Sequence, residues 1–147
     1  MSLITLSSLE RITASKLADM LLAANAAGGE SKLAVVDVRD DDHIGGHIRN
    51  SMHFPTQSLD ATMPTLMRKL ADKDTVVFHC ALSQQRGPSA ALRYLREKEA
   101  NGAGEGNVKK TQKVYVLDRG FVGWQEVYGP DERLTEGYRK DIWEEGY

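Results

Sequence analysis

Three short apolar runs recur along the chain, at residues 33–39, 75–79 and 113–117, and each contains β-branched side chains. Runs of this length suit strands that are covered on both faces, whereas helices need ten or more residues. The segment SMHF, at residues 51–54, fits a further short strand. The hydrophobic pattern therefore predicts a sheet of buried strands.

Between these runs, apolar residues recur at the spacing of a helix. Thr13 or Ser15 can cap a first helix that ends at the NAAGG segment, while Pro64 and Pro88 fit the first turns of two later helices. Beyond the first helix, the expected helices cover residues 62–73, 87–99 and 120–129. Helices that alternate with short apolar strands predict an α/β domain with a mostly parallel central sheet flanked by helices.

The remaining segments fit a single domain that covers residues 1–147. Residues 100–112 are rich in glycine and charge, and we expect them to form a flexible surface loop inside this domain. Residues 130–147 are polar with scattered aromatic side chains, which indicates a tail. These aromatics fit packing of the last helix and tail better than stacking on nucleic acid, because no basic groove accompanies them.

The composition of the chain narrows the functional classes. Its 19 basic and 21 acidic residues give a net charge of −2, which provides no broad positive field for nucleic acid or an anionic membrane. The single cysteine excludes an internal disulfide and multi-cysteine metal clusters, and indicates a reducing compartment. No apolar run approaches the roughly 20 residues that span a bilayer, and the amino-terminal segment lacks a signal-peptide pattern. We therefore expect a cytoplasmic, or nuclear, protein without nucleic-acid or membrane partners.

The one cysteine, Cys80, directly follows the second apolar run, and Arg86 follows six positions later where a helix begins. In a parallel sheet this position lies at the carboxyl edge of the strands, where ligands bind. The five residues from Ala81 to Gln85 can present successive backbone N–H groups to one tetrahedral oxyanion, and the helix start adds partial positive charge. The pattern therefore predicts an oxyanion site at Cys80.

The chemistry of the two side chains extends this prediction. A thiol beside such donors is expected to be a thiolate at neutral pH, and the planar fork of Arg86 can hold two oxyanion oxygens. Together they favour nucleophilic attack by Cys80 on a phosphoryl-like centre, with the developing charge held by the loop and Arg86. The alternative interpretation is a buried structural cysteine beside a solvated arginine.

Longer segments carry a family resemblance. HCALSQQRGPSAA resembles the active-site motif of the cell-division-cycle 25 (Cdc25) phosphatases and of the fungal and plant arsenate reductases, all of the rhodanese fold. VVDVRDDDHIGGHIRNSMHFP is similar to the first strand and following loop of rhodanese-like domains, and VYVLDRGFVGW resembles their last strand and glycine-rich turn. The resemblance spans Val35 to Trp124 in the expected order and implies a rhodanese-like three-layer domain.

The resemblance also implies roles for particular residues. Cys80 takes the role of nucleophile and Arg86 that of oxyanion clamp. His79, which precedes the cysteine, also matches the motif and fits a residue that shapes the loop at least as well as one with a direct chemical role. Asp37 and Arg39 fit supporting residues that fix strand and loop geometry by pairing. The implied amide cradle consists of Ala81, Leu82, Ser83, Gln84 and Gln85.

One position departs from the family pattern. Cdc25 phosphatases often carry a glutamate just before the arginine, a proposed proton donor, whereas this chain has Gln85, whose amide cannot donate a catalytic proton. Asp118 and the acidic run 40–42 are conceivable donors, although loop acids are usually solvated. No metal site is expected, because three histidines that follow the first strand lack firm ligand spacing. These are His43, His47 and His53.

The leading functional hypothesis is a cysteine-dependent phosphatase of the protein-tyrosine or dual-specificity type, which acts on phosphate monoesters such as phosphotyrosine or phosphothreonine through a phosphocysteine. The alternative is an arsenate reductase that uses the same cysteine. Because the chain has no second thiol, external glutathione or glutaredoxin would then supply the electrons. A sulfurtransferase is a weaker option, since enzymes of that type typically have a four-residue loop, and a non-catalytic phospho-binding module would not need the thiol. We expect no resident cofactor, and a phosphorylated protein or a small phosphate or arsenate oxyanion as ligand.

Overall fold

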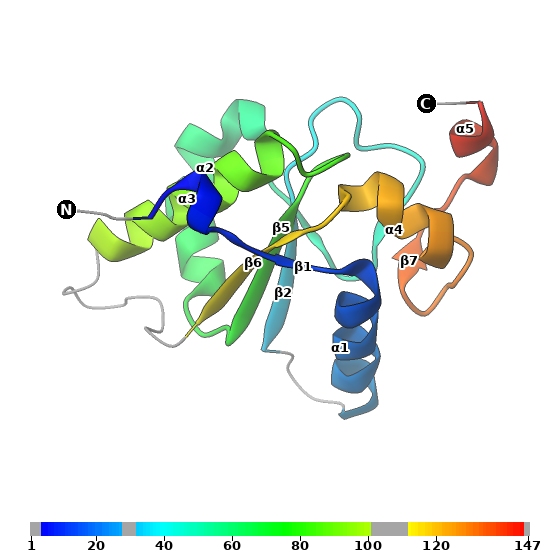
Figure 1. The fold of residues 1–147 in the computed structure, drawn as a ribbon, viewed down its shortest axis with the longest axis horizontal. Coiled ribbons are helices and arrows are strands. Elements are labelled where there is room, and N and C mark those ends of the chain that lie inside the picture. Colours follow the sequence, from blue (N-terminus) through cyan, green and yellow to red (C-terminus); the bar gives the residue numbers. More distant parts are fainter. Residues whose placement is uncertain (1–3, 28–31, 101–111, 146–147) are drawn as a thin grey trace.

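The computed structural model describes residues 4–27, 32–100 and 112–145. Within these residues, five parallel strands form a sheet with the order β1-β6-β5-β2-β4. The strands are β1 (Glu10–Ile12), β2 (Leu33–Asp37), β4 (Met52–His53), β5 (Thr75–His79) and β6 (Lys113–Leu117). A separate antiparallel ribbon pairs β3 (His47–Ile48) with β7 (Thr135–Glu136). The predicted α/β arrangement around a parallel sheet is confirmed (Figure 1).

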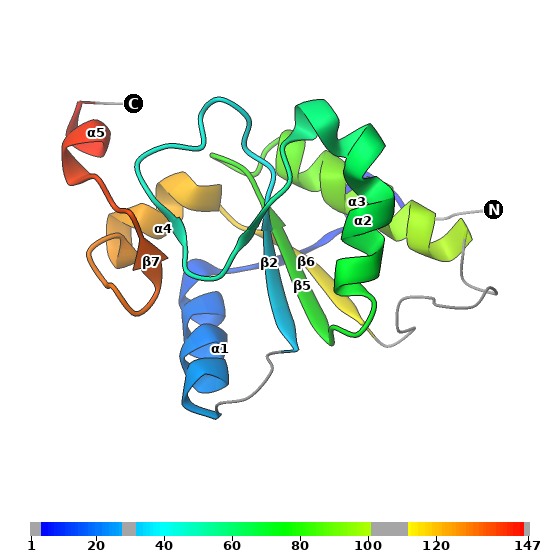
Figure 2. The ribbon, with the colours of Figure 1, turned by 180° about the vertical axis from the view of Figure 1, so that it is seen from behind.

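Helices cover both faces of this sheet, with α2 and α3 on one side and α1 and α4 on the other (Figures 1 and 2). Neighbouring residues of a strand point to opposite faces, so Val36 packs in the core beneath α2 and α3 while Val35 packs in the core beside α1 and α4. The helices are α1 (Ala14–Ala27), α2 (Leu59–Leu70), α3 (Arg86–Ala100), α4 (Gly120–Tyr128) and α5 (Lys140–Glu144). None of the helices in the described part of the chain is long and apolar enough to cross a membrane.

Several local features differ from the sequence prediction. Helix α2 begins at Leu59, because burial of Leu59 and Met63 extends its apolar face, so Pro64 lies inside the helix rather than in its first turn. The pattern also missed β1 and the β3–β7 ribbon, whose two or three residues are too short to show a period. Most of the loop expected at residues 100–112 lies outside the described residues.

The carboxyl ends of the central strands bring the predicted site residues to one edge. Asp37 at the end of β2 is the register partner of His79 at the end of β5, and Cys80 follows directly. On the other side of β5, strand β6 leads through a tight turn into α4. Three chain segments therefore meet around the cysteine: the loop after β2, the loop after β5 and the start of α4.

Candidate active site

The loop from Cys80 to Arg86 folds back on its own sulfur. The N–H of Gly87, in the first turn of α3, donates to Cys80 Sγ at 3.3 Å, and the N–H of Cys80 donates to Ser83 Oγ at 3.5 Å. Ser83 is fully buried and has a left-handed φ of 57°, which turns the chain sharply at the middle of the loop. Strand β5 ends at His79 and α3 begins at Arg86, so residues 81–85 form a loop between Cys80 and the helix, as predicted. Ser83 in the middle of this loop and Gly87 just after it both contact the cysteine.

The loop amides are unpaired donors. Within the described residues, the N–H groups of residues 81–85 donate no hydrogen bond to any protein acceptor. A left-handed residue between such groups is typical of backbone nests, which bind anions through several N–H donors at once. Cys80 itself is only 3% exposed and packs in the core beneath α2 and α3, and its sulfur accepts the N–H of Gly87 at the start of α3. The loop can therefore accept a tetrahedral oxyanion over the sulfur.

The start of α4 orients the loop from behind. The N–H of Phe121 donates to the Cys80 carbonyl at 3.0 Å, and the N–H of Val122 donates to the Ala81 carbonyl at 2.9 Å. In a trans peptide the carbonyl and the next N–H point in opposite directions, so the N–H groups of Ala81 and Leu82 face away from α4. These two contacts hold the first donors of the loop in place.

Gly120 makes this close approach possible. Its φ is +55°, in the left-handed region, and a Cβ at this position would lie 2.5 Å from the carbonyl oxygens of both Cys80 and Ala81. Only glycine avoids this clash and this backbone strain together. The glycine-rich turn after β6 is thus a structural part of the cysteine loop.

Arg11 braces the opposite side of the loop, and sequence reasoning missed it. Its Nη2 atom donates to the Ser83 carbonyl at 3.1 Å, and its Nη1 atom lies 3.7 Å from Asp118 Oδ1. Asp118, a conceivable proton donor on sequence grounds, therefore pairs with a loop-bracing arginine. No sequence signal marks Arg11, because its strand has only three residues and pairs with β6, more than 100 positions away.

Arg86 holds a carboxylate in its fork. Its Nη1 and Nη2 atoms donate to the two oxygens of Asp42 at 2.7 and 2.5 Å, and Nη1 also lies 3.4 Å from Asp40. The hydrogen bond with Asp42 raises the pKa of Arg86 above its ordinary value, burial opposes the rise, and the charge at Cys80 adds to it. Among the described residues, Nε of Arg86 donates to no acceptor. The clamp predicted for the oxyanion therefore has one edge occupied by Asp42 and another edge open.

The sequence suggested that the acidic run at residues 40–42 is solvated, but two of its three carboxylates are hydrogen-bonded to other residues. Asp40 accepts hydrogen bonds from Thr56 Oγ1 at 2.5 Å and from the Gln57 N–H at 3.0 Å. Burial opposes ionisation of Asp40, but these bonds lower its pKa, and the bond from Arg86 likewise lowers the pKa of Asp42. Only Asp41 of the run is exposed. Both bound carboxylates are therefore held in the charged form.

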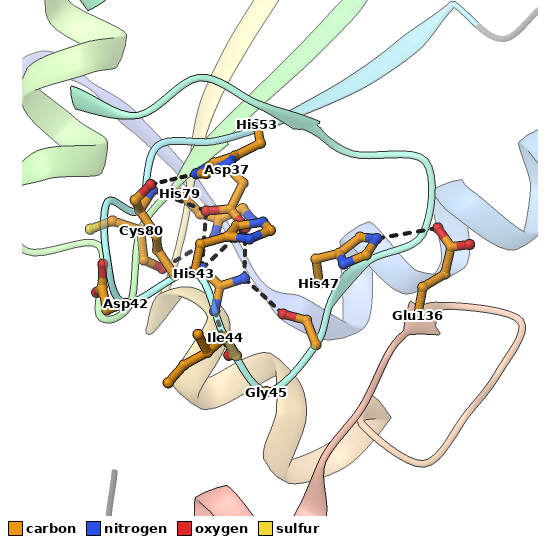
Figure 3. Close-up of polar contacts among 12 residues, drawn as sticks. Asp37, Asp42, His43, Ile44, Gly45, His47, His53, His79, Cys80 and Glu136 are labelled. Carbon is orange, nitrogen blue, oxygen red and sulfur yellow. Dashed lines mark hydrogen bonds and ion pairs between the residues drawn. The ribbon is translucent and has the colours of Figure 1, made fainter. Parts of the chain in front are cut away.

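The Asp37 side chain (Figure 3) forms a buried ion pair with Arg39, with an Nη2···Oδ2 distance of 2.7 Å. Arg39 also donates to the Gly46 carbonyl at 2.9 Å, and its guanidinium lies 4.3 Å from the centre of the Phe121 ring. Burial alone would raise the pKa of Asp37, but the charge of His79 and the bonds from Arg39 lower it to about 2. This pair holds the loop after β2, which fits the supporting role expected from the sequence for both residues.

His79 shapes the backbone at the cysteine. Its Nδ1 donates to the Cys80 carbonyl at 3.1 Å, while its buried Nε2 has no hydrogen-bond partner in the described residues and lies 3.8 Å from Asp37 Oδ2. Complete burial lowers the pKa of His79, although the charge of Asp37 partly opposes this effect. The contact favours the loop-shaping role for His79.

The three histidines that seemed scattered in the sequence lie together in space. The rings of His43 and His53 stack with centroids 3.8 Å apart, and those of His43 and His47 lie 5.7 Å apart. His53 Nε2 donates to the Arg39 carbonyl at 2.6 Å, and His43 Nε2 lies 3.4 Å from Asp37. Among the residues that the structure describes, no three His, Cys, Asp or Glu side chains are arranged to hold a metal ion.

The chain is similar to a known domain family, to phosphatases and arsenate reductases, and to solved structures. The sequence matches the profile of the rhodanese-like domain over residues 13–127. It is 40% identical over 119 residues to a Cdc25-like phosphatase of Saccharomyces cerevisiae, YCH1, which covers 74% of this chain and 76% of that protein. It is 44% identical over 115 residues to arsenate reductase 2.1 of Oryza sativa, which covers 75% and 67%. A crystal structure of an S. cerevisiae protein superposes on this chain with a TM-score of 0.76 at 32% sequence identity. The match covers 95% of this chain and 94% of the yeast protein, which is described as a homologue of single-domain rhodanese and of the Cdc25 phosphatase catalytic domain.

Proposed function

The chain belongs to the family of rhodanese-like domains, and we propose that it is a cysteine-dependent phosphatase with Cys80 as nucleophile and Arg86 as oxyanion clamp. The observation that carries the proposal is the run of unpaired N–H donors over the cysteine sulfur. Such donors stabilise the charge that develops on phosphoryl oxygens during transfer. The substrates of this reaction are phosphate monoesters, and phosphorylated proteins are the main class.

The reaction proceeds in two displacements. The Cys80 thiolate attacks phosphorus as the bond to the leaving oxygen breaks, and water then attacks the phosphocysteine and releases phosphate and the thiolate. Residues 81–85 and Arg86 hold the non-bridging oxygens in both steps. Gln85 supplies no proton, and Asp40 and Asp42 are held as carboxylates. We therefore expect the free enzyme to favour substrates whose leaving group is stable as an anion, such as aryl phosphates.

Arsenate reduction is the second candidate, and the similarity to a plant arsenate reductase favours it. The same thiolate would attack arsenic in place of phosphorus. Reduction of arsenate to arsenite takes two electrons, which two external thiols supply as they join in a disulfide, with release of water. Glutathione, with glutaredoxin as a partner protein, provides this chemistry.

A side-by-side assay tests both activities. Wild-type and Cys80→Ser proteins are compared for phosphate release from an aryl phosphate and for arsenite formation with glutathione and glutaredoxin. Turnover of the aryl phosphate that disappears in Cys80→Ser supports the phosphatase, and arsenite formation with the same dependence supports the reductase. If neither product forms while the Cys80→Ser protein still binds phosphate, the loop is a binding module and the proposed function is wrong.

A further inference from the structure

A groove of about 370 Å³ opens directly beside the oxyanion clamp. Its walls come from the turn that precedes α2, from the start of α2, from the end of the cysteine loop and from α3. The lining residues are Thr56, Leu59, Gln85, Arg86, Ser89, Ala90 and Arg93. Because Arg86 belongs both to this groove and to the cysteine loop, a molecule whose phosphoryl group lies over Cys80 can extend into the groove.

One face of α3 forms the long wall of the groove. Arg86, Ser89, Ala90 and Arg93 are spaced by three, four and seven positions, so they lie along a single side of the helix. Seven residues of α-helix rise by about 10 Å, which separates the two arginines by two turns. The groove therefore has the oxyanion clamp at one end and a second guanidinium at the other.

The Arg93 guanidinium can exchange its present carboxylate partner for another one. Arg93 forms an ion pair with Asp60, but the Asp60 side chain is 88% exposed and that of Arg93 is 39% exposed. An ion pair in such a setting contributes little stability because both partners are well hydrated. A carboxylate from another molecule can therefore replace Asp60 on Arg93 at low cost.

A second hollow continues beyond this pair. It has a volume of about 320 Å³, and Arg93 lines both hollows. Its other lining residues are Asp60, Met63, Pro64, Met67 and Glu97. An extended chain that leaves the first groove at Arg93 next meets the residues of the second hollow, which include the flexible and polarisable side chains of Met63 and Met67.

We propose that this groove binds the polypeptide beside the phosphorylated residue of a substrate, and that Arg93 selects an acidic side chain in it. The proposal rests on the proposed phosphatase function and names its substrate class. An extended peptide advances about 3.3 Å per residue, so the distance of about 10 Å between the arginines corresponds to three residues. The preferred substrates are phosphopeptides with Asp or Glu three positions from the phosphorylated residue.

Matched phosphopeptides test this specificity. Peptides with Glu, Gln or Lys three positions before or after a phosphotyrosine are assayed with wild type, Arg93→Gln, Arg93→Glu and Asp60→Asn. We expect wild type to prefer Glu over Lys, on one side of the phosphotyrosine, by about three- to tenfold in kcat/KM. Arg93→Gln should abolish the preference, Arg93→Glu should reverse it, and Asp60→Asn should strengthen it. Hydrolysis of a small aryl phosphate should remain unchanged in every variant.

The matched control is Arg96→Gln, since Arg96 lies on the same helix but donates to the Ile4 carbonyl outside the groove. A preference that survives in Arg93→Gln, or that falls equally in Arg96→Gln, overturns the proposal. Failure of the phosphatase function has a different signature, because wild type would then leave the aryl phosphate intact. In that case the affinities of the same peptides for the Cys80→Ser protein test peptide binding in the groove without turnover. Equal affinities for the Glu and Lys peptides would contradict the proposed selection by Arg93.

Discussion

The guanidinium of Arg86 is held by both carboxylate oxygens of Asp42, at 2.7 and 2.5 Å, although 44 positions separate the two residues. The contact joins the loop after β2 to the loop after β5 at the carboxyl edge of the sheet. It gives the arginine a fixed position but also neutralises part of the positive charge that an incoming oxyanion would meet. Asp42 therefore influences both the orientation and the field of the clamp.

Replacing Asp42 with Asn should tighten the binding of inorganic phosphate. The substitution removes the negative charge from the guanidinium fork, and an ion pair whose side chains are each about one third exposed is worth about 0.4–1 kcal/mol, or about two- to fivefold in affinity. Isothermal titration with phosphate measures the change. Asp41→Asn serves as the control, because Asp41 is exposed in the same loop. Equal or weaker phosphate binding by Asp42→Asn would contradict this view of the contact.

Arg86→Lys should lower kcat/KM for an aryl phosphate by about 100-fold or more. A lysine ammonium keeps the charge but cannot donate two parallel hydrogen bonds to an oxyanion. The thermal midpoint should change little, since the Arg86 side chain is about one third exposed. Near-normal turnover by the lysine variant would show that a point charge suffices and that the planar fork has no special role.

Gly120→Ala should destabilise the protein and impair the cysteine loop at once. A Cβ at residue 120 meets the Cys80 and Ala81 carbonyls, and the left-handed φ adds strain, so we expect a loss of about 2–4 kcal/mol in the free energy of unfolding. Gly137→Ala is the matched control, because Gly137 has a φ of +66° but no atom within 4 Å of its Cβ position. Urea unfolding should show a loss of about 1 kcal/mol for the control. Equal losses in both variants would mean that the clash is relieved elsewhere.

The Asp37 carboxyl should contribute its full stabilisation only at pH values above its unfolded-state pKa. Its folded-state pKa is about 2 against an ordinary value of 3.8, so the unfolded chain takes up the proton first as the pH falls. The stability that ionised Asp37 contributes, about 2 kcal/mol, is complete above pH 4 and is lost between about pH 4 and pH 2. Titration of the Asp37 carboxyl by NMR measures this directly. A midpoint near 3.8 would show that the buried pair with Arg39 does not favour the charged form.

The sequence contained enough information to predict the elements that depend on neighbouring residues. Cys80 and Arg86 lie within seven positions of each other, so their loop could be recognised from the motif and from the flanking strand and helix. The contacts of Arg86 with Asp42 and of Arg11 with Ser83 join residues 44 and 72 positions apart, and no spacing rule encodes them. The stack of His43 on His53 likewise depends on how the loop after β2 closes. Long-range pairing of this kind is visible only once the sheet is assembled.

The presence of only one cysteine has a consequence for the durability of the enzyme. An oxidant that converts the Cys80 sulfur to a sulfenic acid finds no internal resolving thiol, so the chain cannot protect the oxidised sulfur as its own disulfide. Recovery then requires a small external thiol, or capture of the sulfenic acid by a backbone nitrogen, before irreversible oxidation to the sulfinic acid. The working lifetime of the molecule is thus set by the reducing power of its surroundings.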